Sequence, residues 1–143
     1  MLLEPERRFI ASHLVGHLAT ANAAGVPHVV PVCFAVTKST AYITIDAKPK
    51  RGQPTRLKRV RNIEENPLAS LVVDRYSNDW SQLGWVMLHG PAEILATGEE
   101  HDHAQSLLRA RYHQLADMDI EHLPVIAIRI ARTSSWGNLS TGD

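Results

Sequence analysis

The sequence predicts a mainly β protein, a β-barrel with peripheral helices, and three observations lead to this prediction. Six short segments carry the alternating or continuous apolar pattern of strands. Several follow one another through tight turns, which indicates antiparallel pairing, and they do not alternate strictly with helices as βαβ units would. No glycine-rich turn follows the first strand, so neither a dinucleotide-binding fingerprint nor a P-loop is present. A doubly wound parallel sheet is the weaker alternative.

The first half of the chain supplies one helix and three strands. The stretch "EPERRFIASHLVG" predicts an opening helix, and its apolar face carries Phe9, Ile10, His13 and Leu14. The stretch "HLATANAAGVPHVVPVCFAV" predicts two strands around a small-residue turn at residues 22–25. "TAYITID" alternates as a third strand does.

The second half supplies two helices and three strands. Residues 55–66 predict a short helix, which Pro67 ends by restricting the preceding residue. "LASLVVDRY" and "WVMLHGPAEIL" predict two strands, separated by a polar loop that carries Trp80. "GEEHDHAQSLLRARYHQLAD" predicts a longer helix with acids at its start, and "LPVIAIRIART" a sixth strand. Without repeats or an interior linker, residues 1–143 are expected to form a single domain.

Positive charge is concentrated in one segment of an electrically neutral chain. Fifteen cations balance fifteen acids, and seven of those cations lie within residues 48–61, where there is no acid. The rest of the molecule keeps eight cations against fifteen acids, a net charge of −7. This pattern favours a compact anion as the partner. It argues against nucleic acid, because the segment also lacks the aromatic residues on which bases stack.

A phosphate or carboxylate needs converging donors, and the basic segment offers three kinds. A proline-stiffened loop would bring Lys48, Lys50 and Arg51 to the start of the helix expected at residues 55–66. That helix contributes Arg56, Lys58 and Arg59, together with the backbone N–H groups of its first turn. The alternative is a solvated basic face that only balances the acidic body.

Other chemistries find little support in the sequence. Cys33 is the only cysteine, which excludes an internal disulfide, and its apolar surroundings indicate a buried, inert thiol. The histidines show no metal-ligand spacing, so no metal is expected, and no GxSxG nucleophile motif occurs. The charged N-terminus differs from a signal peptide, and no apolar run reaches membrane-spanning length. We therefore expect a cytoplasmic protein with neither a membrane nor a nucleic acid as partner.

The order of these features resembles the pyridoxamine 5′-phosphate oxidase-like superfamily of flavin- and deazaflavin-binding split β-barrels. The strands "GHLAT", "PHVVPVCFAV" and "AYITID" precede a basic helix "LKRVRNI" that "ENP" closes, and "LASLVVDRY" follows. The most specific motif places a cation three residues before an Asn–aliphatic pair, and then Asn–Pro. Here these positions are Arg59, Asn62, Ile63, Asn66 and Pro67. The resemblance implies a six-stranded antiparallel FMN-binding split β-barrel.

The resemblance also implies where a cofactor would bind. Its phosphate would lie against the loop and helix after the third strand, held by Lys50, Arg51 and Arg59, with weaker contributions from Lys48, Arg56 and Lys58. Two neighbouring strands would border the ring system through Pro31, Val32, Ile45 and Asp46. Members of the family bind two cofactors across a homodimer interface. Trp80 or Trp136 would therefore come from the partner chain, or would instead form part of the dimer core.

The segments "DAKPKR" and "DRYSNDWSQLGWVMLHGPAEI" resemble the branch that uses the deazaflavin coenzyme F420. Seven cations exceed what a single FMN phosphate requires, and F420 carries a polyanionic glutamyl tail, so the resemblance favours F420 over the alternative, FMN. The implied activity is an oxidoreductase that transfers a hydride to an unsaturated small organic substrate. Tyr76, His28 and His89 are possible proton donors, but no catalytic residue stands out. A haem-binding barrel and a non-catalytic cofactor carrier are the other interpretations.

Overall fold

The computed structural model describes residues 2–45 and 57–142. Within them the chain forms mostly antiparallel β structure, which confirms the predicted class. The strands are β1 (Gly16–Ala21), β2 (Pro27–Val32), β3 (Phe34–Val36), β4 (Thr40–Thr44), β5 (Leu68–Arg75), β6 (Gly84–Leu95), β7 (Val125–Arg129) and β8 (Arg132–Gly137). The helices are α1 (Glu4–Ala11), α2 (Lys58–Glu65), α3 (Glu99–Arg111) and α4 (His113–Ala116), with a short 3-10 turn η2 (Trp80–Gln82).

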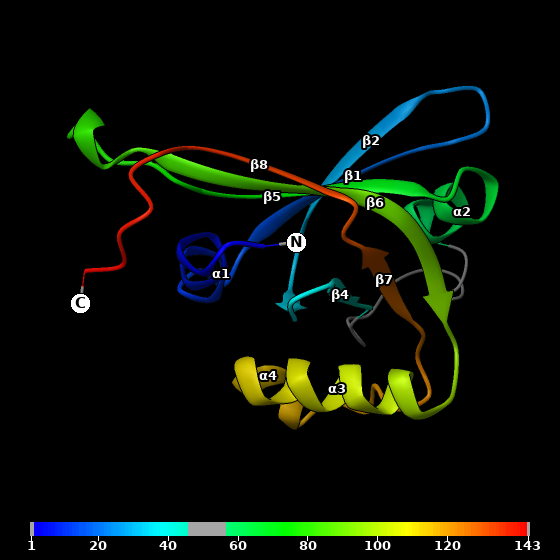
Figure 1. Ribbon diagram of the computed structural model, residues 1–143. Helices are drawn as coiled ribbons and strands as arrows, with labels where there is room; N and C mark the ends of the chain where they lie inside the picture. The colour runs from blue at the N-terminus through cyan, green and yellow to red at the C-terminus, as the bar shows by residue number, and fades with distance from the viewer. Residues whose placement is uncertain (1, 46–56, 143) are drawn as a thin grey trace.

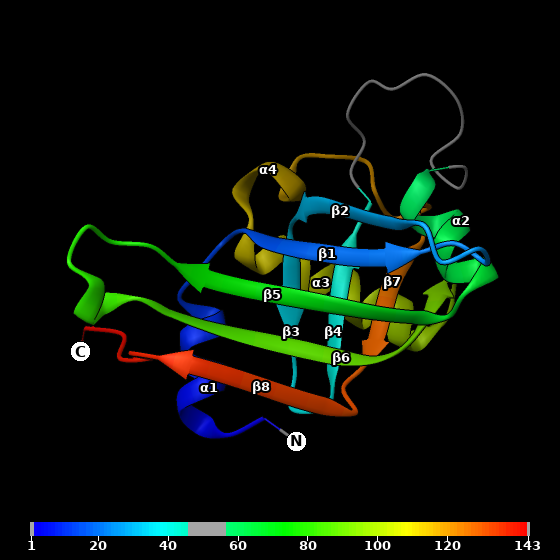
Figure 2. The same cartoon turned by 90° about the horizontal axis from the view of Figure 1, so that it is seen from above.

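Two sheets share the long strand β6. The first has the order β2-β1-β5-β6-β8, and the second runs β6-β7-β4-β3. The N-terminal part of β6 pairs with β5 and β8, and its last residues, Ala92 to Leu95, pair with β7. Gly90 lies just before the residues of β6 that pair with β7. A larger residue would not fit there, because its Cβ would lie 1.7 Å from the carbonyl oxygen of Arg129. β6 thus joins the sheets into a split barrel (Figures 1 and 2).

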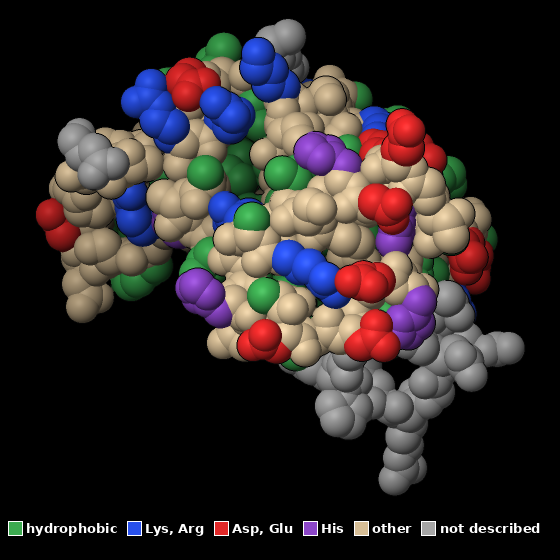
Figure 3. Space-filling view, turned by 90° about the horizontal axis from the view of Figure 1, so that it is seen from below, with side chains coloured by type: hydrophobic (Ala, Val, Ile, Leu, Met, Phe, Trp, Pro, Cys, Tyr) green, Lys and Arg blue, Asp and Glu red, His purple; other side chains and the backbone are tan. Residues whose placement is uncertain are grey.

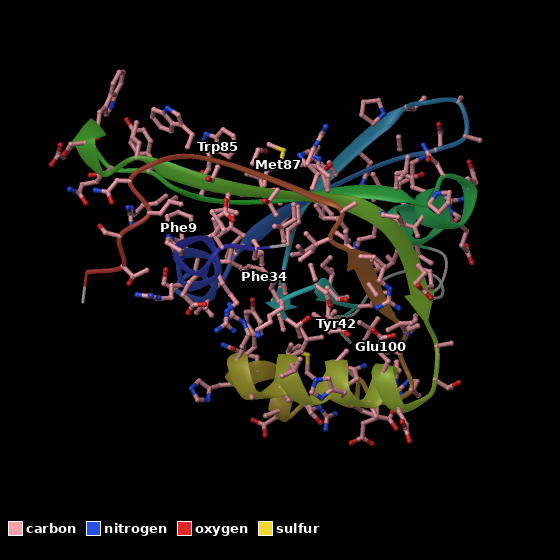
Figure 4. The ribbon with its side chains drawn as sticks, viewed as in Figure 1. Phe9, Phe34, Tyr42, Trp85, Met87 and Glu100 are labelled. Atoms are coloured by element: carbon pink, nitrogen blue, oxygen red, sulfur yellow. The ribbon has the colours of Figure 1, made fainter. Side chains whose placement is uncertain are left out.

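Helices cover only one side of the five-stranded sheet. Figure 1 shows α1, α3 and α4 below it, while no described helix lies above it. The strand register shows which side chains share the upper face. His17 of β1 lies directly opposite Pro31 of β2 and Val72 of β5, so these three side chains point to the same face. Figure 4 shows Trp85 and Met87 of β6 on this uncovered side, away from Phe9 and Phe34. The core therefore lies between the sheets and beneath the first one.

Strand β4 separates two hydrophobic clusters. The larger one fills the barrel and includes Phe34, Ile43 and Ile45, all fully buried. The smaller one packs α3 and α4 against the other face of the second sheet, through Tyr42 among others. Every residue of β4 is buried because the strand has protein on both faces. Cys33 is half-buried rather than buried as the sequence predicts, and it packs against the smaller cluster.

The strand count is eight rather than six, because two predicted strands change partners midway. The segment predicted as the second strand divides at Cys33, where β2 leaves β1 and β3 begins to pair with β4. The segment predicted as the last strand divides after Arg129, and β8 then pairs with β6. Trp136 belongs to β8, whereas the predicted strand ended before it. Apolar periodicity is continuous through both points, so it does not reveal a change of sheet.

Two helices are shorter than the sequence predicts. α1 ends at Ala11, so Leu14 is 56% exposed and does not extend its apolar face. The long helix predicted over residues 98–117 breaks at Tyr112, whose backbone is extended. The Tyr112 hydroxyl accepts a hydrogen bond from the N–H of Phe34 at 2.9 Å and donates to the carbonyl of Leu14 at 2.9 Å. These tertiary bonds tie Tyr112 to β3 and to the segment before β1, and the separate helix α4 begins at His113. No helix in the described part of the chain is both long and apolar enough to cross a membrane.

Candidate functional site

Helix α2 carries the predicted anion-binding cations that the structure describes. Lys58 and Arg59 lie in its first turn, which has no acidic residue, and the preceding Leu57 provides no side-chain cap for the helix N–H groups. Lys58 is exposed and Arg59 is half-buried. A cationic first turn whose N–H groups receive no cap from the Leu57 side chain suits an anionic group. The predicted residues Asp46, Lys48, Lys50, Arg51 and Arg56 lie outside the described residues.

A buried hydrogen bond fixes α2 to the first sheet. The Asn62 side chain donates through Nδ2 to Oγ1 of Thr20 in β1 at 3.0 Å, and the two residues are 1% and 5% exposed. At the end of the helix, the Glu65 carboxylate accepts a hydrogen bond from the N–H of Ala23, in the β1–β2 turn, at 3.0 Å. The Asn of the family motif thus positions the helix that carries Lys58 and Arg59. Sequence reasoning used Asn62 only to recognise the motif and missed this role.

The residues predicted to border the cofactor ring do not share one face of the sheet. Pro31 is exposed on the uncovered face of the first sheet. Val32 and Ile45 belong to the core, with 8% and 0% of their surface exposed. A ligand next to these two positions would therefore meet mainly their backbone, whereas Pro31 offers its side chain.

The two tryptophans predicted to reach the cofactor ring lie away from Pro31. Trp136 is 55% exposed on β8, opposite Trp85, and Trp80 is 72% exposed in η2, near the far end of the β5–β6 hairpin. β2 and β8 form the two edges of the five-stranded sheet. Four strand spacings separate these edges, about 19 Å. Within one chain, then, Pro31 and Trp136 do not reach the same small ring.

A hydroxyl–imidazole pair lies on the uncovered face. Ser70 Oγ of β5 is 2.7 Å from Nδ1 of His89 on β6. Partial burial lowers the pKa of His89 below its ordinary 6.5, as does the Arg132 guanidinium, so both favour the neutral imidazole. The pair borders an open groove of about 430 Å³, which reaches from Pro27 on β2 to Asn66 after α2.

The other possible proton donors differ in position. Tyr76 is 70% exposed beyond the end of β5. His28 lies on β2 opposite Thr20, and its Nδ1 is buried without a hydrogen-bond partner among the described residues. His101 is buried and bonds to the carbonyl of Leu123 at 2.7 Å, which makes it a structural residue. Where the structure describes the chain, no group of three or more His, Cys, Asp or Glu side chains could hold a metal ion.

Comparisons with known proteins agree with this architecture. Residues 2–137 match the family described as "Pyridoxamine 5'-phosphate oxidase". A 5a,11a-dehydrotetracycline/5a,11a-dehydrooxytetracycline reductase from Streptomyces rimosus subsp. rimosus is 30% identical over 97% of this chain and 87% of its own length.

Solved structures share the fold. A haem-binding protein from Mycobacterium smegmatis superposes with a TM-score of 0.76 at 23% identity over 98% of this chain. The chain spans only 55% of that protein's length. An F420 reductase gives a TM-score of 0.66 at 23% identity, over 93% of this chain and 98% of the reductase.

Proposed function

This chain belongs to the pyridoxamine 5′-phosphate oxidase family, and from that premise we propose that it is an oxidoreductase that uses the deazaflavin coenzyme F420, with FMN as the alternative cofactor. Its substrate would be an unsaturated small organic molecule. The observation that carries the proposal is the 30% identity to a dehydrotetracycline reductase along nearly the whole chain. The F420 reductase of the same fold is consistent with it.

The basic helix supports an anionic cofactor. The first turn of α2 offers Lys58, Arg59 and its backbone N–H groups, and the hydrogen bond from Asn62 to Thr20 holds the helix against β1. A phosphate arm is recognised by such a combination of cations and backbone donors. The cofactor, when bound, supplies the hydride chemistry. The chain's own residues would hold its charged arm, orient its ring and exclude water from it.

The uncovered sheet face supports a homodimer. Its exposed apolar side chains include Val29 of β2, Leu68 of β5 and Trp136 of β8, which are 64%, 60% and 55% exposed. An apolar face without a covering helix is typical of a protein interface. We propose that a second copy covers it, because only a second copy could bring Trp80 or Trp136 to a ring beside Pro31. We also place the protein in the cytoplasm, on the basis of its single cysteine.

Replacing Arg59 with alanine tests the arm-binding role of α2. The loss of one charge-assisted contact should weaken F420 binding about tenfold or more. Arg61→Ala is the matched control, since Arg61 is an exposed cation on the same helix outside the proposed site. Affinity is measured by fluorescence titration, and folding by circular dichroism. Equal F420 affinities for folded Arg59→Ala, Arg61→Ala and wild-type protein would contradict the assignment.

The colour of the purified protein separates the remaining interpretations. F420, FMN and haem differ in absorption and fluorescence, and the haem-binding protein of the same fold makes haem a relevant comparison. A haem spectrum without deazaflavin or flavin binding would favour that alternative. A protein that binds F420 or FMN but reduces no unsaturated substrate would be a cofactor carrier.

A further inference from the structure

A second groove lies on the helical side of the molecule, away from α2 and the uncovered sheet face. It has a volume of about 450 Å³ and is formed by α1, β3, the turn after β3 and the last turns of α3. Its lining residues are Arg7, Ile10, Ala11, Phe34, Ala35, Val36, Thr37, Lys38, Leu107, Ala110 and Arg111. None of them belongs to the proposed cofactor site. The view from below shows Lys and Arg side chains around hollows in which hydrophobic side chains are visible (Figure 3).

The floor of this groove is apolar. Its accessible apolar surface comes from the half-buried Val36 and Leu107, and the fully packed Ile10 and Phe34, which are 1% and 0% exposed, lie directly beneath. The one neutral polar side chain in the lining is Thr37, whose hydroxyl donates to the carbonyl of Thr40 at 3.3 Å. A sugar or a nucleotide would lose hydrogen bonds to water here without replacing them. An apolar ring or short chain would instead gain from burial.

The charges of the groove are all positive. Arg7, Lys38 and Arg111 line it, and no acid among the described residues does, although the chain as a whole has equal numbers of cations and acids. Arg111 is fixed in place: its guanidinium donates to the carbonyls of Ala11, His13 and Phe34 at 3.2, 2.7 and 2.9 Å.

Two of these cations lack a carboxylate partner. Within the described residues, neither Arg111 nor Lys38 is paired with an acid, whereas Arg7 forms an exposed ion pair with Glu4 through contacts of 3.4 and 3.5 Å. Arg111 also lies over the Phe34 ring, 5.0 Å from its centroid, so positive charge sits directly beside the apolar floor. An anion in the groove would supply the missing counter-charge.

We propose that this groove binds a small organic carboxylate whose body is an apolar ring system or short chain. The apolar body would pack on Val36, Leu107 and Ala110, above the buried Ile10 and Phe34, and the carboxylate would face Arg7, Lys38 and Arg111. The volume falls within the range of roughly 300–1,000 Å³ that small-molecule sites occupy. The site does not depend on the proposed cofactor, so its test and the test of the cofactor site succeed or fail separately.

The test compares two ligands that differ in charge but hardly in shape. The full-length protein is titrated with 1-naphthoate and with its neutral isostere 1-naphthamide by isothermal calorimetry, without added cofactor. Naphthoate is expected to bind saturably at one site per chain, about tenfold or more tightly than the amide, because charge-assisted contacts are stronger than neutral ones. Equal affinities, or no saturable naphthoate binding up to millimolar concentration, would overturn the proposal.

Substitutions then locate the binding site. Arg7→Gln and Lys38→Gln should each weaken naphthoate binding several-fold and leave naphthamide binding unchanged. Arg8→Gln is the matched control: Arg8 lies next to Arg7 and shares its partner Glu4, at 3.5 Å, but is 67% exposed and does not line the groove. Arg111 is left intact, because its loss would break three structural hydrogen bonds. Identical naphthoate affinities for Arg7→Gln and Arg8→Gln would place the ligand elsewhere and refute this site.

Discussion

The hydrogen bond between Asn62 and Thr20 gives the sharpest prediction about how α2 is held. Thr20→Val removes the hydroxyl at nearly constant shape and leaves the Asn62 amide donor buried without its partner. Asn62→Leu similarly leaves the Thr20 hydroxyl unpaired. An unsatisfied buried polar group costs about 1–3 kcal/mol, so each single substitution should lower the free energy of unfolding by that amount.

The double variant distinguishes this bond from simple packing effects. With both partners apolar, no unpaired polar group remains, so Thr20→Val/Asn62→Leu should lose less than the sum of the two singles by about 1 kcal/mol or more. Urea unfolding followed by circular dichroism measures all four proteins. Each single variant should also weaken F420 binding, because α2 carries Lys58 and Arg59. Additive losses, or singles within the error of wild type, would refute this role for Asn62.

Two further predictions concern acid stability and assembly. Hydrogen bonds from Arg129 and Tyr42 lower the pKa of Glu100 from 4.5 to about 2, so the stability they confer is present above pH 4.5 and is lost as the pH falls toward 2. The unfolding free energy of Glu100→Gln should not show this dependence on pH. Because the Glu100 side chain is 39% exposed, the difference between the two proteins should be about 1 kcal/mol. Parallel pH profiles for Glu100→Gln and wild-type protein would contradict this prediction. Val29→Glu should shift the protein toward monomer in sedimentation equilibrium. Leu3→Glu, at an equally exposed position on the helical side, should not. A dimer that is unchanged by Val29→Glu would argue against the uncovered face as the interface.

Much of the fold could be predicted from local patterns. The tight turn near Gly25, the alternation of β4 and the proline that ends α2 each leave a signal in neighbouring residues, and the structure agrees with all three. The changes of sheet at Cys33 and after Arg129 leave no such signal, because both halves of each segment remain strand-like. Local sequence sets strand character, and tertiary contacts set strand partners.

The site was predictable to a smaller extent. The basic start of α2 is visible in the sequence because it belongs to residues 48–61, where seven cations occur without an acid. The pairing of Ser70 with His89 depends on strand register, and the groove beside Arg111 depends on packing between α1 and α3, so neither has a sequence signature. Figure 4 shows a third case of this kind, in which Tyr42 and Glu100 point toward one another from β4 and α3.

Direct titration of the purified protein with F420 and with FMN tests the central claim most directly. The account predicts saturable F420 binding, with FMN binding more weakly because it lacks the polyanionic tail. It further predicts that added salt weakens F420 binding, as expected for an arm held by lysines and arginines. Protein that is folded yet binds neither cofactor at any salt concentration would contradict the account.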